Sequence, residues 1–145
     1  IALGYMLGNF LSGRFTQRVG LNRMMLAGAA VATIGMVLAM VLYGVGIVHP
    51  VSFFGCILSI GVGNGMLLPS ANAGIVSVRP HLAGSASGLG GALMIGGGAA
   101  LSVISGALLG PGTGAWPLLI LMFACSFLGI PSSLYVMRIA RLRAL

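Results

Sequence analysis

The sequence predicts an all-α protein, a polytopic transmembrane bundle of about five helices, and three observations support this prediction. Hydrophobic residues make up 59% of the 145 residues, whereas charged residues make up only 5%. A soluble domain carries about 25% charged residues, so lipid is the expected solvent of this chain. Glycine is also abundant, at 25 residues, which is typical of membrane helices.

The helices can be placed from the distances between charged side chains. A membrane helix needs about 20 apolar residues, and residues 24–78 and 80–137 contain no charged side chain. Each stretch is long enough for two spans joined by a turn, and residues 44–50 and 110–114 are rich in the glycine and proline typical of turns. Residues 1–13 are too short to cross alone, so we expect a truncated first helix and a chain that is a fragment. The other expected helices are 24–44, 51–76, 84–109 and 117–137, and the whole chain is expected to form one transmembrane domain, 1–145.

The charges exclude several classes of function. The chain has seven arginines and no lysine, aspartate or glutamate. The arginines are spread among apolar runs, so no nucleic-acid partner is expected. Acid/base pairs, calcium sites and Ser-His-Asp triads all need carboxylates. We therefore expect no enzyme, no catalytic residue, no cofactor and no metal site.

The positions of the arginines predict the orientation of the helices. They fall in the first connection, in the third connection and after the last helix, at Arg14, Arg18, Arg23, Arg79, Arg138, Arg141 and Arg143. With five helices these regions share one face of the membrane, and such a face is normally cytoplasmic. We expect a multi-pass protein of the plasma (inner) membrane with a cytoplasmic C-terminus.

Glycine spacing predicts where helices pack closely, because small residues let membrane helices approach. On 84–109 the small residues share about a third of the circumference, with helix packing expected at Gly84, Gly88, Gly91 and Gly98 and with Ser102 and Ser105 on the same face. The pairs Gly4/Gly8, Gly61/Gly65 and Gly106/Gly110 repeat the four-residue spacing.

Residues 24–44 and 117–137, in contrast, are almost entirely apolar. We expect these two helices to lie at the lipid-facing periphery of the bundle.

Polar side chains within the expected spans are candidates for a substrate cavity. A serine can satisfy its hydroxyl on its own helix, so the stripe of Ser59, Gly63, Met66, Ser70 and Ser77 on one face of the third expected helix is interpreted as packing. An asparagine amide in lipid needs a partner helix or a wet cavity, and both alternatives are open. Methionine offers an adaptable apolar contact. The cavity candidates are Asn9, Asn64, Met66 and Asn72.

Residues 13–23, with the sequence GRFTQRVGLNR, resemble the cytoplasmic-loop signature of the major facilitator superfamily in its second-half copy. Gln17 stands where the signature has an aspartate, and Asn22 replaces one basic residue. In that family the motif belongs to the cytoplasmic gate. The resemblance therefore assigns a gate role to Gly13, Arg14, Gln17, Arg18, Gly20 and Arg23.

Residues 8–14 and 77–88 are similar to the bicyclomycin-resistance (Bcr/CflA) branch of drug:proton antiporters. The resemblance implies the C-terminal half, about helices eight to twelve, of a multidrug or small-metabolite efflux protein that works by alternating access. It implies as partners a missing N-terminal half with the proton-coupling acid, the lipid bilayer, a small-molecule substrate and protons. Two alternatives stay open: a sugar or other metabolite transporter of the same superfamily, and a non-transporting assembly or channel-like subunit.

Overall fold

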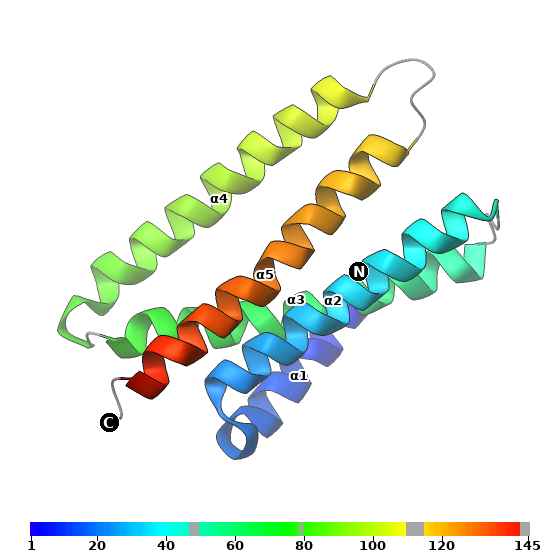
Figure 1. Cartoon of the computed structure of the whole chain (residues 1–145). Helices are drawn as coiled ribbons and strands as arrows, with labels where there is room; N and C mark the ends of the chain where they lie inside the picture. The colour runs from blue at the N-terminus through cyan, green and yellow to red at the C-terminus, as the bar shows by residue number, and fades with distance from the viewer. Residues whose placement is uncertain (47–49, 79, 110–114, 143–145) are drawn as a thin grey trace.

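A computed structural model describes residues 1–46, 50–78, 80–109 and 115–142, and these residues are almost entirely helical (Figure 1). Helix α3 is followed by a short 3₁₀ turn, η1. The elements are α1 (Ala2–Val19), α2 (Leu21–Gly44), α3 (Pro50–Val78), η1 (Pro80–Leu82), α4 (Ala83–Leu108) and α5 (Trp116–Leu142). The prediction of an all-α bundle with five helices is confirmed for the described residues.

Four segments of these helices are long and apolar enough to cross a membrane: Leu21–Gly44, Phe54–Ser77, Ala83–Leu108 and Trp116–Ala140. They agree with the four spans expected from the charge-free stretches, and α1 is not among them. The expected turn at 110–114 lies outside the described residues, as do positions 47–49 of the other turn.

Helix α1 extends further than the sequence predicted. It continues past residue 13 through Arg14 and Arg18, and Gly20 alone separates it from α2. Gly20 has φ 92° and ψ 146°, a conformation open almost only to glycine. The prediction used charge as a helix end, but arginine is a good helix former. An arginine marks the border of the apolar segment and not the end of the helix. Helix α5 likewise continues beyond Met137, to Leu142.

Helix α3 lies between α1 and α2, and glycines determine how closely α1 approaches it. A Cβ atom at Gly61 would lie 2.6 Å from the Ile1 carbonyl oxygen, and one at Gly65 would lie 3.0 Å from the Gly8 Cα. A Cβ at Gly4 would overlap the Leu58 carbonyl oxygen. These contacts confirm the close packing predicted from Gly4/Gly8 and Gly61/Gly65, whereas Gly110 of the third pair lies outside the described residues. They also show that α1 and α3 run parallel, because residue numbers rise together along the contact.

The contact between α2 and α3 depends on small residues in the same way. A Cβ at Gly63 would lie 2.6 Å from both the Gly28 carbonyl oxygen and the Ala32 nitrogen, and a Cβ at Gly35 would lie 2.9 Å from the Ser59 Cβ. Residue numbers now run in opposite directions, so α2 and α3 are antiparallel.

The buried apolar side chains gather mainly on α2: Met24, Ala29, Ala32 and Met36, with Cys56 of α3. The prediction that 24–44 is peripheral is wrong, because α2 packs on both α3 and α5. Apolar composition alone did not reveal that its small residues form two helix contacts.

The serine stripe of α3 takes part in packing, as the sequence indicated. Ser70 is buried, with 2% of its surface exposed, and its hydroxyl shares a hydrogen bond of 3.2 Å with the hydroxyl of Ser12 on α1. Ser59 donates to the Gly55 carbonyl oxygen of its own helix.

Helix α5 packs antiparallel on α2. The Thr33 hydroxyl donates to the Ser126 carbonyl oxygen at 3.1 Å, and the rings of Tyr43 and Trp116 meet edge to face with centroids 5.3 Å apart. Ser133 is buried, whereas most other described side chains of α5 are exposed or half-exposed. This agrees with the peripheral position predicted for 117–137.

Helix α4 stands away from the other helices along much of its length (Figure 1) and has no buried residue. Nothing in the described parts of the chain lies within 4 Å of a Cβ built at Gly84, Gly88, Gly91 or Gly98. The packing role of these four glycines therefore stays a prediction.

We expect Gly8→Ala to destabilise the fold by about 1–3 kcal/mol, because the added methyl group must displace backbone of α3. Gly13→Ala is the matched control on the same helix, since nothing lies within 4 Å of its Cβ. The control should unfold at the wild-type temperature or slightly above, because alanine favours helix over glycine by about 1 kcal/mol. Thermal unfolding of the detergent-purified chain measures both. Equal melting temperatures for Gly8→Ala and the wild type would contradict this packing.

Candidate functional site

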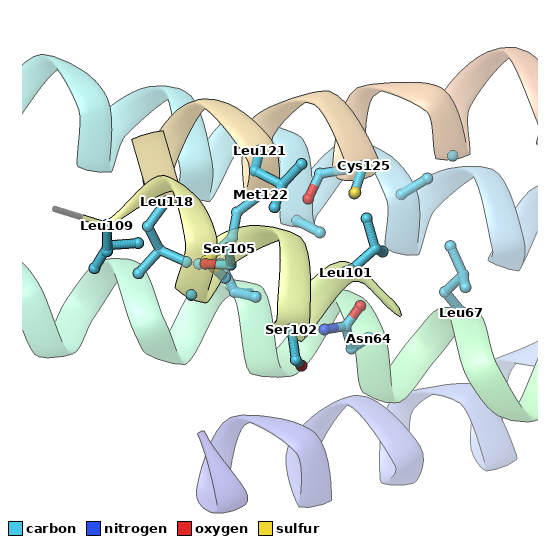
Figure 2. Close-up of a pocket in the computed structure, with 16 residues that line it drawn as sticks. Asn64, Leu67, Leu101, Ser102, Ser105, Leu109, Leu118, Leu121, Met122 and Cys125 are labelled. Carbon is cyan, nitrogen blue, oxygen red and sulfur yellow. The ribbon is translucent and has the colours of Figure 1, made fainter. Parts of the chain in front are cut away.

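The main candidate site is a cleft of about 680 Å³ between α2, α3, α4 and α5. Leucine, isoleucine, methionine and alanine side chains form most of its lining, with contributions from all four helices. Figure 2 shows the labelled side chains converging from α3, α4 and α5 on this space.

Asn64 of α3 is the amide side chain among the described residues that line the cleft. Its neighbours Gly63 and Gly65 face α2 and α1 respectively. Because each residue of a helix turns by about 100°, Asn64 points to the third side of α3, toward α4 and α5 (Figure 2). Its side chain is exposed and has no hydrogen bond to another described residue. Two N–H donors and one carbonyl acceptor are thus available to a ligand.

Helix α4 adds two hydroxyl groups to the lining, from Ser102 and Ser105. The Ser102 hydroxyl donates to the Gly98 carbonyl oxygen at 2.9 Å, so its own oxygen can still accept a hydrogen bond. Cys125 of α5 also lines the cleft and is an exposed free thiol, whereas Cys56 is buried and free. The sequence reasoning did not single out these three cleft residues. The face that Ser102 and Ser105 share with the glycines of α4 was the available signal.

The other cavity candidates do not line this cleft. Asn9 of α1 is half-buried, and its backbone nitrogen would lie 3.0 Å from a Cβ at Gly65, which places it at the contact of α1 with α3. Met66 is half-buried and Asn72 is exposed, both on α3. The structure therefore separates Asn64 from the three residues that the sequence grouped with it.

The cleft extends from mid-bundle toward one end. Asn64 lies near the middle of the span Phe54–Ser77, and Leu109 and Leu118 line the cleft close to the connection of α4 with α5. That end lies opposite the α1–α2 turn and the C-terminal end of α5 (Figure 1).

Arginines occupy the other end of the bundle. Arg14 and Arg18 lie on the last turns of α1, Arg23 on the first turn of α2 and Arg138 near the end of α5, and all four side chains are exposed. The alternating helix directions bring these four to one end, as the sequence predicted. Arg141 lies in the last turn of α5, and Arg79 and Arg143 lie outside the described residues.

The gate motif is part of two helices. Its first four residues, Gly13, Arg14, Gln17 and Arg18, lie on α1, Gly20 forms the break and Arg23 begins α2. Arg14 and Arg18 are one turn apart, and like charges at this spacing destabilise a helix by about 0.2–0.5 kcal/mol. Arg23 lies in the first turn of α2 with no acidic residue beside it, so it faces the positive end of that helix dipole, whereas Arg18 in the last turn of α1 lies at a negative end, where a cation is favourable.

No protein-family model, curated protein or solved structure matches this chain. The structure itself defines the class: a helical protein whose four long apolar helices are those of a multi-pass membrane protein.

Proposed function

We propose that this chain is part of a secondary active transporter, a multidrug or small-metabolite efflux protein that uses proton antiport by alternating access. In this proposal it is the C-terminal half of a major facilitator superfamily protein of the Bcr/CflA type, located in the plasma (inner) membrane. The observation that carries the proposal is the apolar cleft with one free amide in the middle of the membrane-length helices.

The size and chemistry of the cleft support a small, largely apolar substrate. Ligand pockets measure about 300–1,000 Å³ and combine an apolar lining with a few polar groups that orient the ligand. The cleft, at about 680 Å³, has this composition, with Asn64, Ser102 and Ser105 as its orienting groups. Transporters of this kind bind their substrates near the bilayer midplane, and Asn64 lies at that depth of α3.

The ends of the bundle support an orientation of the cleft in the membrane. A face rich in arginine is normally cytoplasmic, and the cleft extends away from that face. In the proposal the cleft is the outward-facing part of an export route, and the arginine end with its gate motif forms the cytoplasmic side.

Helix α4 supports a second half as partner. It is 26 residues long, has no buried residue, and leaves seven glycines without a neighbour in the described chain, including the four for which packing is predicted. Small residues on a membrane helix favour close packing. We propose that the N-terminal half of the transporter covers this face and provides the remaining wall of the cleft.

Asn64→Ala should raise the KM for export about two- to tenfold, the effect of losing one hydrogen bond to the substrate. The complete protein, expressed in bacteria that lack their own efflux pumps, is assayed by efflux of chloramphenicol, an uncharged compound. Asn72→Ala is the matched comparison, because it removes the same amide from the same helix outside the cleft. We expect a smaller effect from it. Unchanged export by Asn64→Ala, or an equal loss in both variants, would contradict the assignment of the site.

The 145-residue chain alone should not conduct protons. Reversible protonation within a membrane needs an acid or a well-placed histidine, and the chain has no aspartate or glutamate. In liposomes with a pH gradient, a trapped pH dye should report the same leak with and without the chain. The complete protein, assayed in parallel with a substrate, should dissipate the gradient. Proton flux through the chain alone would favour the channel-like alternative over this proposal.

A further inference from the structure

Four exposed arginines lie at one end of the bundle: Arg14, Arg18 and Arg23, which are close in the sequence, and Arg138, which is far from them. The first three flank the single-residue break at Gly20. Helices α2 and α5 are antiparallel, with Thr33 bonded to Ser126 and Gly129 beside Ala29. The same register places Arg138 level with Gly20. We call these four residues the arginine patch.

The arginine patch has no counter-charge within the chain. None of the 145 residues is aspartate or glutamate, and the four guanidinium groups make no hydrogen bond or ion pair with the described residues. Arg14 and Arg18 also repel each other across one helical turn. Any acidic group that pairs with the patch must therefore come from outside this sequence.

The position of the patch along the helices indicates where that anion lies. Arg23 is the third residue of the span Leu21–Gly44, and Arg138 is the third from the end of the span Trp116–Ala140. Spans of 24 and 25 residues exceed the roughly 20 residues needed to cross the hydrocarbon core. The terminal residues of these spans, Arg23 and Arg138 among them, are therefore expected at the depth of the lipid headgroups.

The residues beside the patch favour the same location. Phe15 and Val19 are exposed, with 38% and 41% of their surfaces accessible. They lie one turn apart on α1, directly beside the stripe of Arg14 and Arg18. A helix end with an apolar stripe next to a basic stripe suits the border between acyl chains and headgroups.

The type of cation also matters. All seven basic residues are arginine and none is lysine, although either residue gives the positive charge that sets membrane orientation. A guanidinium group binds phosphate through two parallel N–H donors, whereas an ammonium group acts as a point charge.

We propose that the arginine patch binds the phosphate groups of anionic phospholipids, with Arg14, Arg18 and Arg23 as the main contacts. This interaction concerns the outer surface of the bundle, not the cleft, and it does not depend on transport. It neutralises the end of the bundle at which α1 turns into α2.

The test measures binding of the purified 145-residue chain to fluorescent phosphatidylglycerol and to phosphatidylcholine in neutral detergent. A hydrogen bond to a charged group contributes at least about a tenfold factor in affinity. The variant Arg14→Gln/Arg18→Gln/Arg23→Gln should thus lose at least about tenfold in affinity for phosphatidylglycerol, while binding of phosphatidylcholine stays weak. Ser87→Ala, which removes an exposed hydroxyl from the start of α4, is the control and should bind as the wild type.

The variant Arg14→Lys/Arg18→Lys/Arg23→Lys keeps the charge and tests recognition by guanidinium groups. It should bind phosphatidylglycerol more weakly than the wild type while its melting temperature without lipid stays unchanged. Equal binding of the two lipids by the wild type, undiminished binding by the Gln variant or equal binding by the Lys variant would overturn the proposal. So would displacement of phosphatidylglycerol by inorganic phosphate or by an oligoglutamate peptide at equal charge concentration, because the patch would then prefer a soluble anion or an acidic protein segment.

Discussion

The close approach of the backbones of α1 and α2 to α3 is the constraint on which the rest of the structure depends. Gly61 and Gly65 allow the backbone of α1 to approach α3, and Gly63 allows that of α2 to do so. Lipid provides no hydrophobic drive for helices to associate, so such contacts rely on close packing of small residues. Since two sides of α3 are occupied in this way, its third side, with Asn64, is left to line the cleft.

The sequence predicts most of the fold because membrane helices obey simple rules of length and charge. The four spans and the common end of the described arginines are as expected. Close packing at Gly4 and Gly8 is also as expected, although the sequence did not identify α3 as the neighbouring helix. The sequence placed α2 at the periphery because an apolar surface that faces lipid and one that faces another helix have the same composition. Likewise, Asn64 and Asn72 lie only about 80° apart around α3. Their roles cannot be distinguished until the helices beside them are known, so they were grouped together from the sequence alone.

The absence of aspartate and glutamate determines what each end of the molecule can bind. In a chain with seven arginines and no acid, each positive charge must be compensated by solvent, lipid or another chain. An acidic side chain that carries a proton through the membrane must also come from elsewhere. The arginine end is therefore suited to contacts at the membrane surface. The opposite part of the bundle, where an apolar cleft contains one amide, is suited to an uncharged or weakly polar ligand.

Cross-linking of α1 to α3 tests the central packing most directly. In a chain carrying Cys56→Ala and Cys125→Ser, the pair Ser12→Cys/Ser70→Cys replaces two hydroxyls that lie 3.2 Å apart. The pair Gly13→Cys/Ser70→Cys is the control, because a Cβ at Gly13 has no neighbour within 4 Å. After mild oxidation of membranes and cleavage between the two helices, the first pair should hold the fragments together and the control should release them. Efficient cross-linking of both pairs, or of neither, would contradict the parallel packing of α1 on α3.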